Sequence, residues 1–343
     1  MAFMFSAAGV FRLVLPLAFV VVVAGAYTRI ADAGLGCPDW PGCYGKLIGV
    51  PSAAEADDYL SGGDNNAESN GENDDGNNAP AYDRKKAAIE IAHRYIAGLL
   101  GLLIFAGAFL AWREKKAAAT AINKAKAKAA AALAVLVCAQ ALLGMITVTD
   151  NLRPVVVVAH LLGGMLILFV LARIAFARDN GDNMDSQKNN NRVFAAIAVL
   201  VLFGQIALGG WVSANYAGLA CGDFPLCQGG WMPHSADFSG FDPRRELHKT
   251  PDGAQVSDAA LATMHWLHRI GAIVAFMVLS AFALLRWRGG RRLGGGVLLV
   301  LLAGQITLGI VVVLLRLPVA VALLHNVAAA LLVINIAVLS ARR

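Results

Sequence analysis

Two short segments combine ionisable side chains that could do chemistry, Glu90-Ile-Ala-His-Arg94 and His265-Trp-Leu-His-Arg269. The first places a carboxylate, an imidazole and a guanidinium within five residues, and each segment opens a long apolar stretch. Ionisable side chains inside a membrane span are costly, so their presence there favours a functional role. Two such clusters in equivalent places predict a duplicated site.

The composition is that of a membrane protein. Of the 343 residues, 58% are hydrophobic and 15% are charged, and the mean hydropathy is +0.61. A soluble domain carries about 25% charged residues. The net charge of +6 lies in short basic clusters beside apolar stretches, a pattern that reports membrane topology rather than nucleic-acid binding. We therefore exclude nucleic acid as a partner and expect the chain to lie in a lipid bilayer.

Eight apolar stretches are long enough to cross a bilayer, which takes about 20 residues. They cover approximately residues 10–28, 88–112, 129–149, 155–177, 193–213, 259–285, 293–315 and 318–340. The expected fold class is therefore an all-α membrane protein with eight transmembrane helices. The first stretch could instead be a cleaved signal peptide, but its counterpart in the fifth stretch favours a retained helix.

Basic residues predict the orientation of the chain. Lysine and arginine gather between the second and third spans, between the sixth and seventh, and at the C-terminus, and all three places lie on one side. The positive-inside rule makes that side cytoplasmic, together with both termini. The loops 29–87 and 214–258 then lie outside, in an oxidising compartment where disulfides persist. We expect a multi-pass protein of the bacterial inner membrane.

Two cysteine pairs, Cys37 with Cys43 and Cys221 with Cys227, share one spacing in these outer loops. In a structural role, each pair would close a small loop by a disulfide. In a redox role, a pair would exchange with thiols, which requires an exposed or strained bond. The structural role is favoured, more firmly for the second pair. The fifth cysteine, Cys138, lies in an apolar stretch and is expected in the core.

The chain is a tandem duplication of a four-span unit. Residues 34–45 (GLGCPDWPGCYG) align without gaps with residues 218–229 (GLACGDFPLCQG), at an offset of 184. Gln-x-x-Leu-Gly segments match at 140–144 and 305–309, and a third, at 205–209, opens the second unit. An even number of spans per unit predicts a parallel repeat, with two four-helix bundles related by a pseudo-two-fold axis along the membrane normal.

The repeat divides the chain into two domains. We expect an N-terminal four-helix unit over 1–178, a cytoplasmic linker over 179–192 and a C-terminal four-helix unit over 193–343. The first outer loop contains an acidic, Asn- and Gly-rich insert, about residues 53–80. This insert holds too few apolar residues to bury a core, so we predict that it is disordered.

Every even-numbered span carries a histidine near its outer end, and these are His93, His160, His268 and His325. Their places in the spans predict one common depth. Neutral imidazoles in an apolar four-helix setting suit axial ligation of haem iron, and two per unit would give two haem sites. A single intramembrane histidine more often bonds a neighbouring helix, but four at matched positions favour ligation. Zinc is disfavoured because no carboxylate–histidine set has metal spacing.

Three further side chains lie beside these histidines. Arg94 and Arg269 directly follow a histidine and could pair with haem propionates through a bidentate guanidinium. Glu90 lies on the same helix face as His93, and its counterpart in the second unit is His265. A carboxylate in only one unit suggests that one site does chemistry while the other holds a permanent cofactor. Alternatively, Glu90 is a water-exposed residue of the first helical turn.

The combination of motifs resembles the haem A synthase family. The resemblance rests on the segment Gly-Leu-Gly-Cys-Pro-Asp-Trp-Pro-Gly-Cys, the Glu-x-x-His-Arg motif, the Gln-x-x-Leu-Gly helices and the four histidines, and it covers all eight spans. It implies oxidation of the C8 methyl group of haem O to a formyl group by two successive hydroxylations, through a geminal diol that loses water. It also implies a role in cytochrome oxidase assembly.

The resemblance assigns roles to residues by matching motif. His93 and His160 would hold the substrate haem O, and His268 and His325 would ligate a permanent haem b that serves electron transfer. Glu90 would lie beside the reacting methyl group and handle protons or stabilise positive charge. Cys37 and Cys43 match a cysteine pair of the family. The implied partners are haem O, the haem O synthase that supplies it and an electron acceptor, and a homo-oligomer is compatible with the resemblance.

Two other functions stay open at this point. A di-haem membrane cytochrome that only relays electrons would need the histidines but not Glu90. A transporter or oxidase-assembly protein built on a parallel repeat would be expected to contain spans broken by Gly or Pro, and the sequence shows no such pair.

Overall fold

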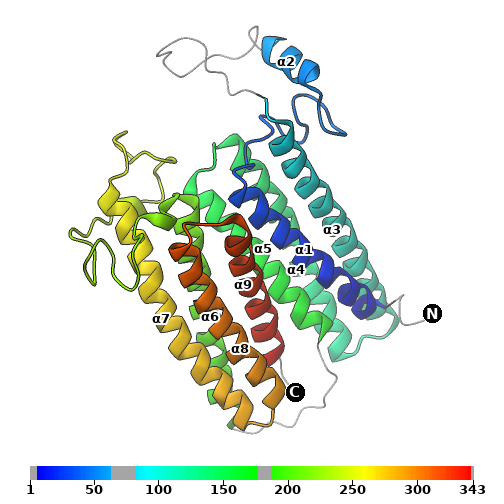
Figure 1. Ribbon diagram of the computed structural model, residues 1–343. Coiled ribbons are helices and arrows are strands. Elements are labelled where there is room, and N and C mark those ends of the chain that lie inside the picture. The colour runs from blue at the N-terminus through cyan, green and yellow to red at the C-terminus, as the bar shows by residue number, and fades with distance from the viewer. Residues whose placement is uncertain (1–5, 63–81, 177–186, 341–343) are drawn as a thin grey trace.

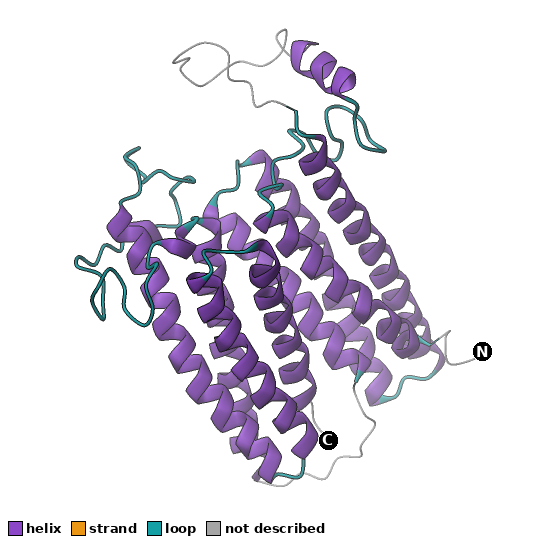
Figure 2. Ribbon diagram, viewed as in Figure 1, coloured by secondary structure: helices purple, strands orange, loops and turns teal. Residues whose placement is uncertain are grey.

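The computed structural model describes residues 6–62, 82–176 and 187–340, and in this part of the chain the regular structure is helical (Figures 1 and 2). Eight helices are long and apolar enough to cross a membrane. They are α1 (Ala7–Ile30), α3 (Arg84–Ala117), α4 (Ala121–Thr149), α5 (Pro154–Ala175), α6 (Gln187–Ala214), α7 (Asp258–Arg288), α8 (Arg292–Leu314) and α9 (Val319–Ser340). The eight predicted spans and the all-α class are therefore confirmed.

The helix beginnings follow from capping chemistry. An α-helix satisfies its own backbone hydrogen bonds, as the bilayer core requires, but its first N–H groups have no partner within the helix. In α1, α3, α4 and α7 a side chain at the N-cap accepts one of these N–H groups. The four capping residues are Ser6, Asp83, Thr120 and Ser257. Helix α5 instead starts with Pro154, whose missing N–H costs nothing at this position.

The helices pack as two sets of four. Helices α1, α3, α4 and α5 contact one another in sequence around one set, and α6, α7, α8 and α9 do so around the other, to the left in Figure 1. The sets meet through α1, α5, α6 and α9. One hydrophobic core cluster, with fully buried side chains such as Phe11, Leu168 and Phe282, draws residues from all eight helices.

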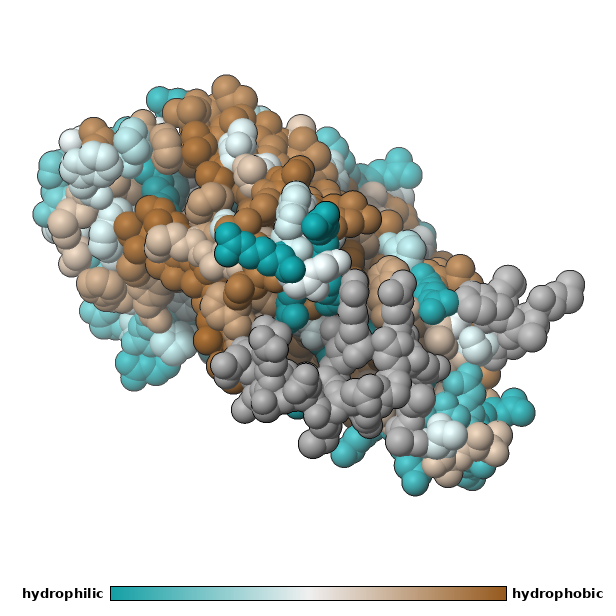
Figure 3. Space-filling view, turned by 90° about the horizontal axis from the view of Figure 1, so that it is seen from below, coloured by the Kyte–Doolittle hydropathy of each residue, from teal (hydrophilic) through white to brown (hydrophobic). Residues whose placement is uncertain are grey.

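The two ends of the helix array differ in character. The loops that contain the cysteines, together with α2, lie at one end, and α1 starts and α9 finishes at the opposite end (Figure 1). Seen from that opposite end, hydrophobic residues cover much of the surface and hydrophilic residues gather in separate patches (Figure 3).

The insert predicted to be disordered over about 53–80 begins with a helix, α2 (Ala53–Gly62), so that prediction is wrong for its first ten residues. The Ser52 hydroxyl accepts the Glu55 N–H at 3.3 Å, and the Glu55 carboxylate accepts the Ser52 N–H at 2.7 Å. This reciprocal capping box starts a helix locally. A bond from Lys46 also holds Glu55, at 2.8 Å, and lowers the pKa of Glu55 to about 2. Residues 63–80 lie outside the described residues.

Two smaller predictions also change. The linker predicted over 179–192 is shorter at its C-terminal side because α6 already begins at Gln187, and residues 177–186 lie outside the described residues. Cys138 is an exposed free cysteine on α4 rather than a core residue, because the face of α4 that carries it points away from the other helices.

Candidate functional site

Both cysteine pairs form disulfides, with S–S distances of 2.08 Å for Cys37–Cys43 and 1.95 Å for Cys221–Cys227. The predicted disulfides are thus confirmed. We call residues 37–45 the first cysteine loop and residues 221–229 the second cysteine loop. Each loop contacts a helix that carries one of the four histidines, through Cys37 and Glu90 on α3 and through Cys221 and His265 on α7.

The two cysteine loops are folded by the same side-chain contacts. In the first, the Asp39 carboxylate accepts the N–H groups of Tyr44 and Gly45, at 2.5 and 3.0 Å. In the second, Asp223 accepts the N–H groups of Gln228 and Gly229, at 2.9 and 2.8 Å. The Gly229 N–H is the main reason why the pKa of Asp223 is lowered. The sequence repeat contained this signal, since the two aspartates are 184 residues apart.

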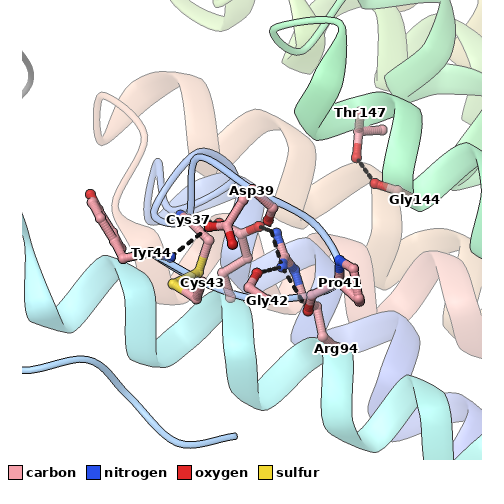
Figure 4. Close-up of polar contacts among 10 residues, drawn as sticks. Cys37, Asp39, Pro41, Gly42, Cys43, Tyr44, Arg94, Gly144 and Thr147 are labelled. Carbon is pink, nitrogen blue, oxygen red and sulfur yellow. Dashed lines mark hydrogen bonds and ion pairs between the residues drawn. A yellow bond between two sulfur atoms is a disulfide. The ribbon is translucent and has the colours of Figure 1, made fainter. Parts of the chain in front are cut away.

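Glu90 and Arg94 tie the first cysteine loop to α3. The buried Glu90 carboxylate accepts the Cys37 N–H at 3.0 Å and pairs with Arg94. Arg94 Nη1 donates to the carbonyls of Asp39 and Gly42, at 3.0 and 2.6 Å. Figure 4 shows the guanidinium reaching from α3 into the loop beside the disulfide. Glu90 is therefore not the water-exposed first-turn residue of the alternative interpretation.

His265 and Arg269 tie the second cysteine loop to α7 in the same manner. His265 is buried, and its Nδ1 lies 3.3 Å from the Cys221 N–H that donates to it. Arg269 Nη1 donates to the carbonyls of Asp223 and Leu226, at 2.9 and 2.7 Å, and Arg269 Nε lies 3.3 Å from His265 Nε2. The propionate role of Arg94 and Arg269 stays a prediction; in this structure both arginines hold a cysteine loop.

The four predicted histidines come together as two pairs. His93 on α3 lies close to His160 on α5, and His268 on α7 lies close to His325 on α9. We call them the first and the second histidine pair. Each pair is formed within one of the two helix sets, as the duplicated motif predicted.

A glycine of a neighbouring helix packs against each imidazole. The glycines are Gly25 on α1, Gly144 on α4, Gly209 on α6 and Gly309 on α8. A methyl group added to any of them would lie 2.9–3.1 Å from the Cε1 atom of the facing histidine. Contacts this short force a shift of the ring, so only glycine leaves the imidazoles where they are. The Gly of the Gln-x-x-Leu-Gly segments signalled this role, whereas Gly25 lacks that motif.

The glutamines of the same segments reach the histidines unevenly. Gln205 Nε2 lies 3.0 Å from His268 Nδ1, and Gln305 Nε2 lies 3.0 Å from His325 Nε2. Gln140 instead donates to the backbone carbonyl of His160, at 2.6 Å. The glutamines thus contact both rings of the second pair and neither ring of the first.

The imidazole nitrogens of the two histidine pairs fit a cofactor that supplies the other ligands of its metal itself. The Nδ1 atoms of His93, His160 and His325 are buried without a hydrogen-bond partner, and a buried polar atom without a partner is costly. No group of three or more metal-binding side chains comes together among the described residues, so these pairs differ from a zinc site. A pair of imidazoles suits an iron whose other ligands come from a porphyrin.

A polar contact between the two helix sets was not predicted from the sequence. Arg29 donates to the Ser213 carbonyl at 2.6 Å, and the Tyr216 hydroxyl donates to Asp32 at 2.6 Å. Burial raises the pKa of Asp32, but bonds from Tyr216 and Lys86 outweigh it, so the pKa is lowered. Both contacts join residues 184 apart, which is the repeat offset and the signal that could have predicted them.

This architecture defines the class of the protein. It is an eight-helix membrane protein with two histidine pairs, each next to a disulfide-closed loop. A family model described as cytochrome oxidase assembly protein matches residues 10–337. The chain belongs to this family.

Curated relatives of similar length carry one name. A heme A synthase of Shewanella oneidensis is 38% identical over 329 residues, covering 95% of this chain and 93% of the relative. A heme A synthase of Methylobacterium nodulans is 26% identical, with 95% and 88% covered. One from Sphingopyxis alaskensis is 28% identical, with 92% and 86% covered. The similarity therefore extends over both helix sets and both cysteine loops.

Proposed function

We propose that this chain is an oxidoreductase of haem A biosynthesis that converts haem O into haem A. It oxidises the C8 methyl group of haem O to a formyl group by successive hydroxylations, and the electrons that are removed pass through a bound haem b to an external electron acceptor. One observation carries the proposal: the chain builds two histidine pairs, and a buried carboxylate, Glu90, belongs to only one of them. The heme A synthase relatives support it over nearly the whole chain.

The histidines bind and orient the two porphyrins in this proposal. His93 and His160 bind the substrate haem O, and His268 and His325 ligate the permanent haem b. When bound, haem b supplies a one-electron redox centre. The glycines that face the imidazoles hold the rings at fixed positions, because no side chain competes for their space. The apolar helices around each pair exclude water from the ligands.

Glu90 is the candidate catalytic residue. Its carboxylate is fixed by Arg94 and by the Cys37 N–H, one helical turn before His93. A carboxylate held in this way can accept or return a proton or stabilise positive charge close to a porphyrin on His93. Arg94 would position it, and the first cysteine loop would close over the substrate side.

The arrangement of the chain in the membrane belongs to the same proposal. The cysteine loops face the outside, and α1 starts and α9 finishes on the cytoplasmic side of a bacterial inner membrane. The two helix sets are products of a duplication and are related by a pseudo-two-fold axis along the membrane normal. Contacts between residues 184 apart, Arg29 with Ser213 and Asp32 with Tyr216, support this, because equivalent residues meet only close to such an axis.

A di-haem cytochrome that only relays electrons is the second candidate. The observation that favours it is that Glu90 and His265 make equivalent contacts. Each accepts the N–H of the first cysteine of a loop and contacts the arginine four residues later. If holding the loop were all that Glu90 does, the chain would contain no carboxylate dedicated to chemistry.

Two measurements test the proposed function. The purified protein should contain haem b, identified by its optical spectrum and by haem extraction. Cells that express the chain together with a source of haem O should accumulate haem A. A protein with haem b that never yields haem A would favour the electron relay, and a protein without any haem absorption would contradict both functions.

A further inference from the structure

Two consecutive arginines in the loop between α6 and α7 have opposite surroundings. The Arg244 side chain is 80% exposed and binds the Asp242 carboxylate through Nε and Nη2, at 3.1 and 2.7 Å. Arg245 is 1% exposed, which makes it the largest fully buried side chain among the described residues. The loop therefore turns one guanidinium outward and the next inward.

Arg245 has neutral partners only. Its Nε donates to the Gly240 carbonyl at 2.8 Å, and its Nη1 donates to the Glu246 carbonyl at 3.2 Å. Its Nη2 is buried without any hydrogen-bond partner. Asp242 acts on Arg245 through its charge, but its oxygens already accept two bonds from Arg244.

A buried guanidinium with one nitrogen that has no hydrogen-bond partner favours the binding of an anion. Burial lowers the pKa of Arg245, and the charge of Asp242 only partly opposes this. A buried charge without a counter-charge is among the costliest features of a folded protein, whereas a carboxylate on the remaining nitrogen would form a strong charge-assisted hydrogen bond. The geometry thus leaves one donor of a buried cation for a ligand.

Arg245 lies just outside the second histidine pair. The Gly240 carbonyl that accepts from Arg245 also accepts from Trp211 Nε1, at 3.1 Å, and the guanidinium carbon is 5.8 Å from the centre of the Trp211 ring. Gly240 packs on Met264, which is four residues, about 6 Å along α7, before His268. On α6, Trp211 is two residues beyond Gly209, which contacts the His268 ring.

We propose that Arg245 binds a carboxylate of the porphyrin that His268 and His325 hold, through its unpartnered Nη2. The inference rests on the proposed function, because it takes the ligand of the second histidine pair to be a haem with two propionates. It adds Arg245 to the predicted Arg269 in this role; the guanidinium of Arg269 already donates to carbonyls of the second cysteine loop.

The test compares a porphyrin with and without its carboxylates. Full-length protein from cells grown with limited haem is titrated with ferric protoporphyrin IX and with its dimethyl ester, for the wild type, Arg245→Met and Arg244→Met. We expect Arg245→Met to lower the affinity for the diacid about ten- to hundredfold and to leave that for the ester within about threefold. Arg244→Met should bind both porphyrins like the wild type, since Arg244 points into solvent.

Thermal unfolding without porphyrin separates binding from a merely structural role. Removing an unpaired buried charge should leave the unfolding midpoint of Arg245→Met unchanged or raised. A lowered midpoint with equal losses for diacid and ester would make Arg245 structural and overturn the inference. Unchanged diacid affinity would also overturn it, and loss of co-purified phospholipid in that case would identify a lipid phosphate as the ligand. A wild type that binds neither porphyrin would instead contradict the proposed function itself.

Discussion

The two histidine pairs differ in what touches their imidazole rings. In the second pair, an amide nitrogen of Gln205 or Gln305 lies 3.0 Å from a ring nitrogen of each histidine. In the first pair, Gln140 reaches only the backbone carbonyl of His160, and Val21 on α1 occupies the position that a glutamine has in the other segments, four residues before the glycine. The Gln205 contact to His268 Nδ1 leaves Nε2 of that ring for a ligand and suits a permanent one, and rings without such a contact suit a ligand that must leave.

Each cysteine loop is held to its helix by two side chains that we call its clasp, Glu90 with Arg94 for the first loop and His265 with Arg269 for the second. Glu90 and His265 hold equivalent loops through equivalent contacts, so the clasp itself does not require a carboxylate. In the proposed function, the carboxylate at position 90 serves a reaction that the second histidine pair does not carry out. A variant that keeps the contacts to the loop and removes only the carboxylate distinguishes this role from the electron relay.

Removing a predicted histidine ligand should have the largest effect on haem binding and conversion. It should also show which histidine pair serves which haem. His268→Ala should lose the spectrum of haem b, because an axial ligand of the permanent haem is gone. His93→Ala should keep that spectrum and lose conversion of haem O. Optical spectra and extraction of total haem check both variants, and a His93→Ala protein without haem b would show that the pairs are not independent.

Glu90→His should separate the clasp from the chemistry. A histidine at position 90 reproduces what His265 does in the second loop, so the disulfide and the haem b spectrum should remain. Conversion should fall by at least about a hundredfold, the usual contribution of a general acid or base. The yield of haem A in cells supplied with haem O measures the loss, and alkylation of free thiols reports on the loop.

The matched control for this variant is His265→Glu. It makes the two clasps alike and should retain conversion, because the second pair is not the reacting site. Full conversion by Glu90→His would mean that the carboxylate only holds the loop, and the electron relay would then become the better function.

The sequence predicted the parts of this molecule that depend on local pattern. Apolar stretches of sufficient length predicted the eight helices, and the repeated cysteine spacing predicted both disulfides. The equal placement of the histidines predicted two pairs. The helices and the disulfides were predictable because a membrane span or a short disulfide loop is determined by residues that are close in the chain.

Contacts between distant residues were not predictable in the same way. Arg94 donates to loop carbonyls about 50 residues earlier in the chain, and no local pattern in the sequence reports which carbonyls need a donor. The helix α2 was missed because polar composition outweighed the Ser52–Glu55 capping box. No sequence pattern distinguishes the buried Arg245 from the exposed Arg244, since burial depends on how the loop between α6 and α7 folds back.

Gly209→Ala should weaken the second histidine pair moderately. The new methyl group would lie 2.9 Å from His268 Cε1, and displacing the ring costs about 1–3 kcal/mol, which is a loss of haem b affinity of about five- to 150-fold. Gly204→Ala is the matched control on the same helix, because nothing lies within 4 Å of its new methyl group. It should leave haem binding unchanged, and equal losses in both variants would argue for a general effect on α6.

The glutamine contacts should give the smallest effect and test the asymmetry directly. Gln205→Ala removes one hydrogen bond to the His268 ring, worth about 1 kcal/mol, and should speed haem b loss to apomyoglobin about fivefold. Gln140→Ala should leave haem b loss unchanged, because Gln140 contacts a backbone carbonyl in the other helix set. Val21→Gln should have the opposite effect at the first pair. An amide beside His93 would slow the release of the porphyrin from that pair by a similar factor. If Val21→Gln left that release unchanged, ring contacts would not be what distinguishes an exchangeable ligand from a permanent one.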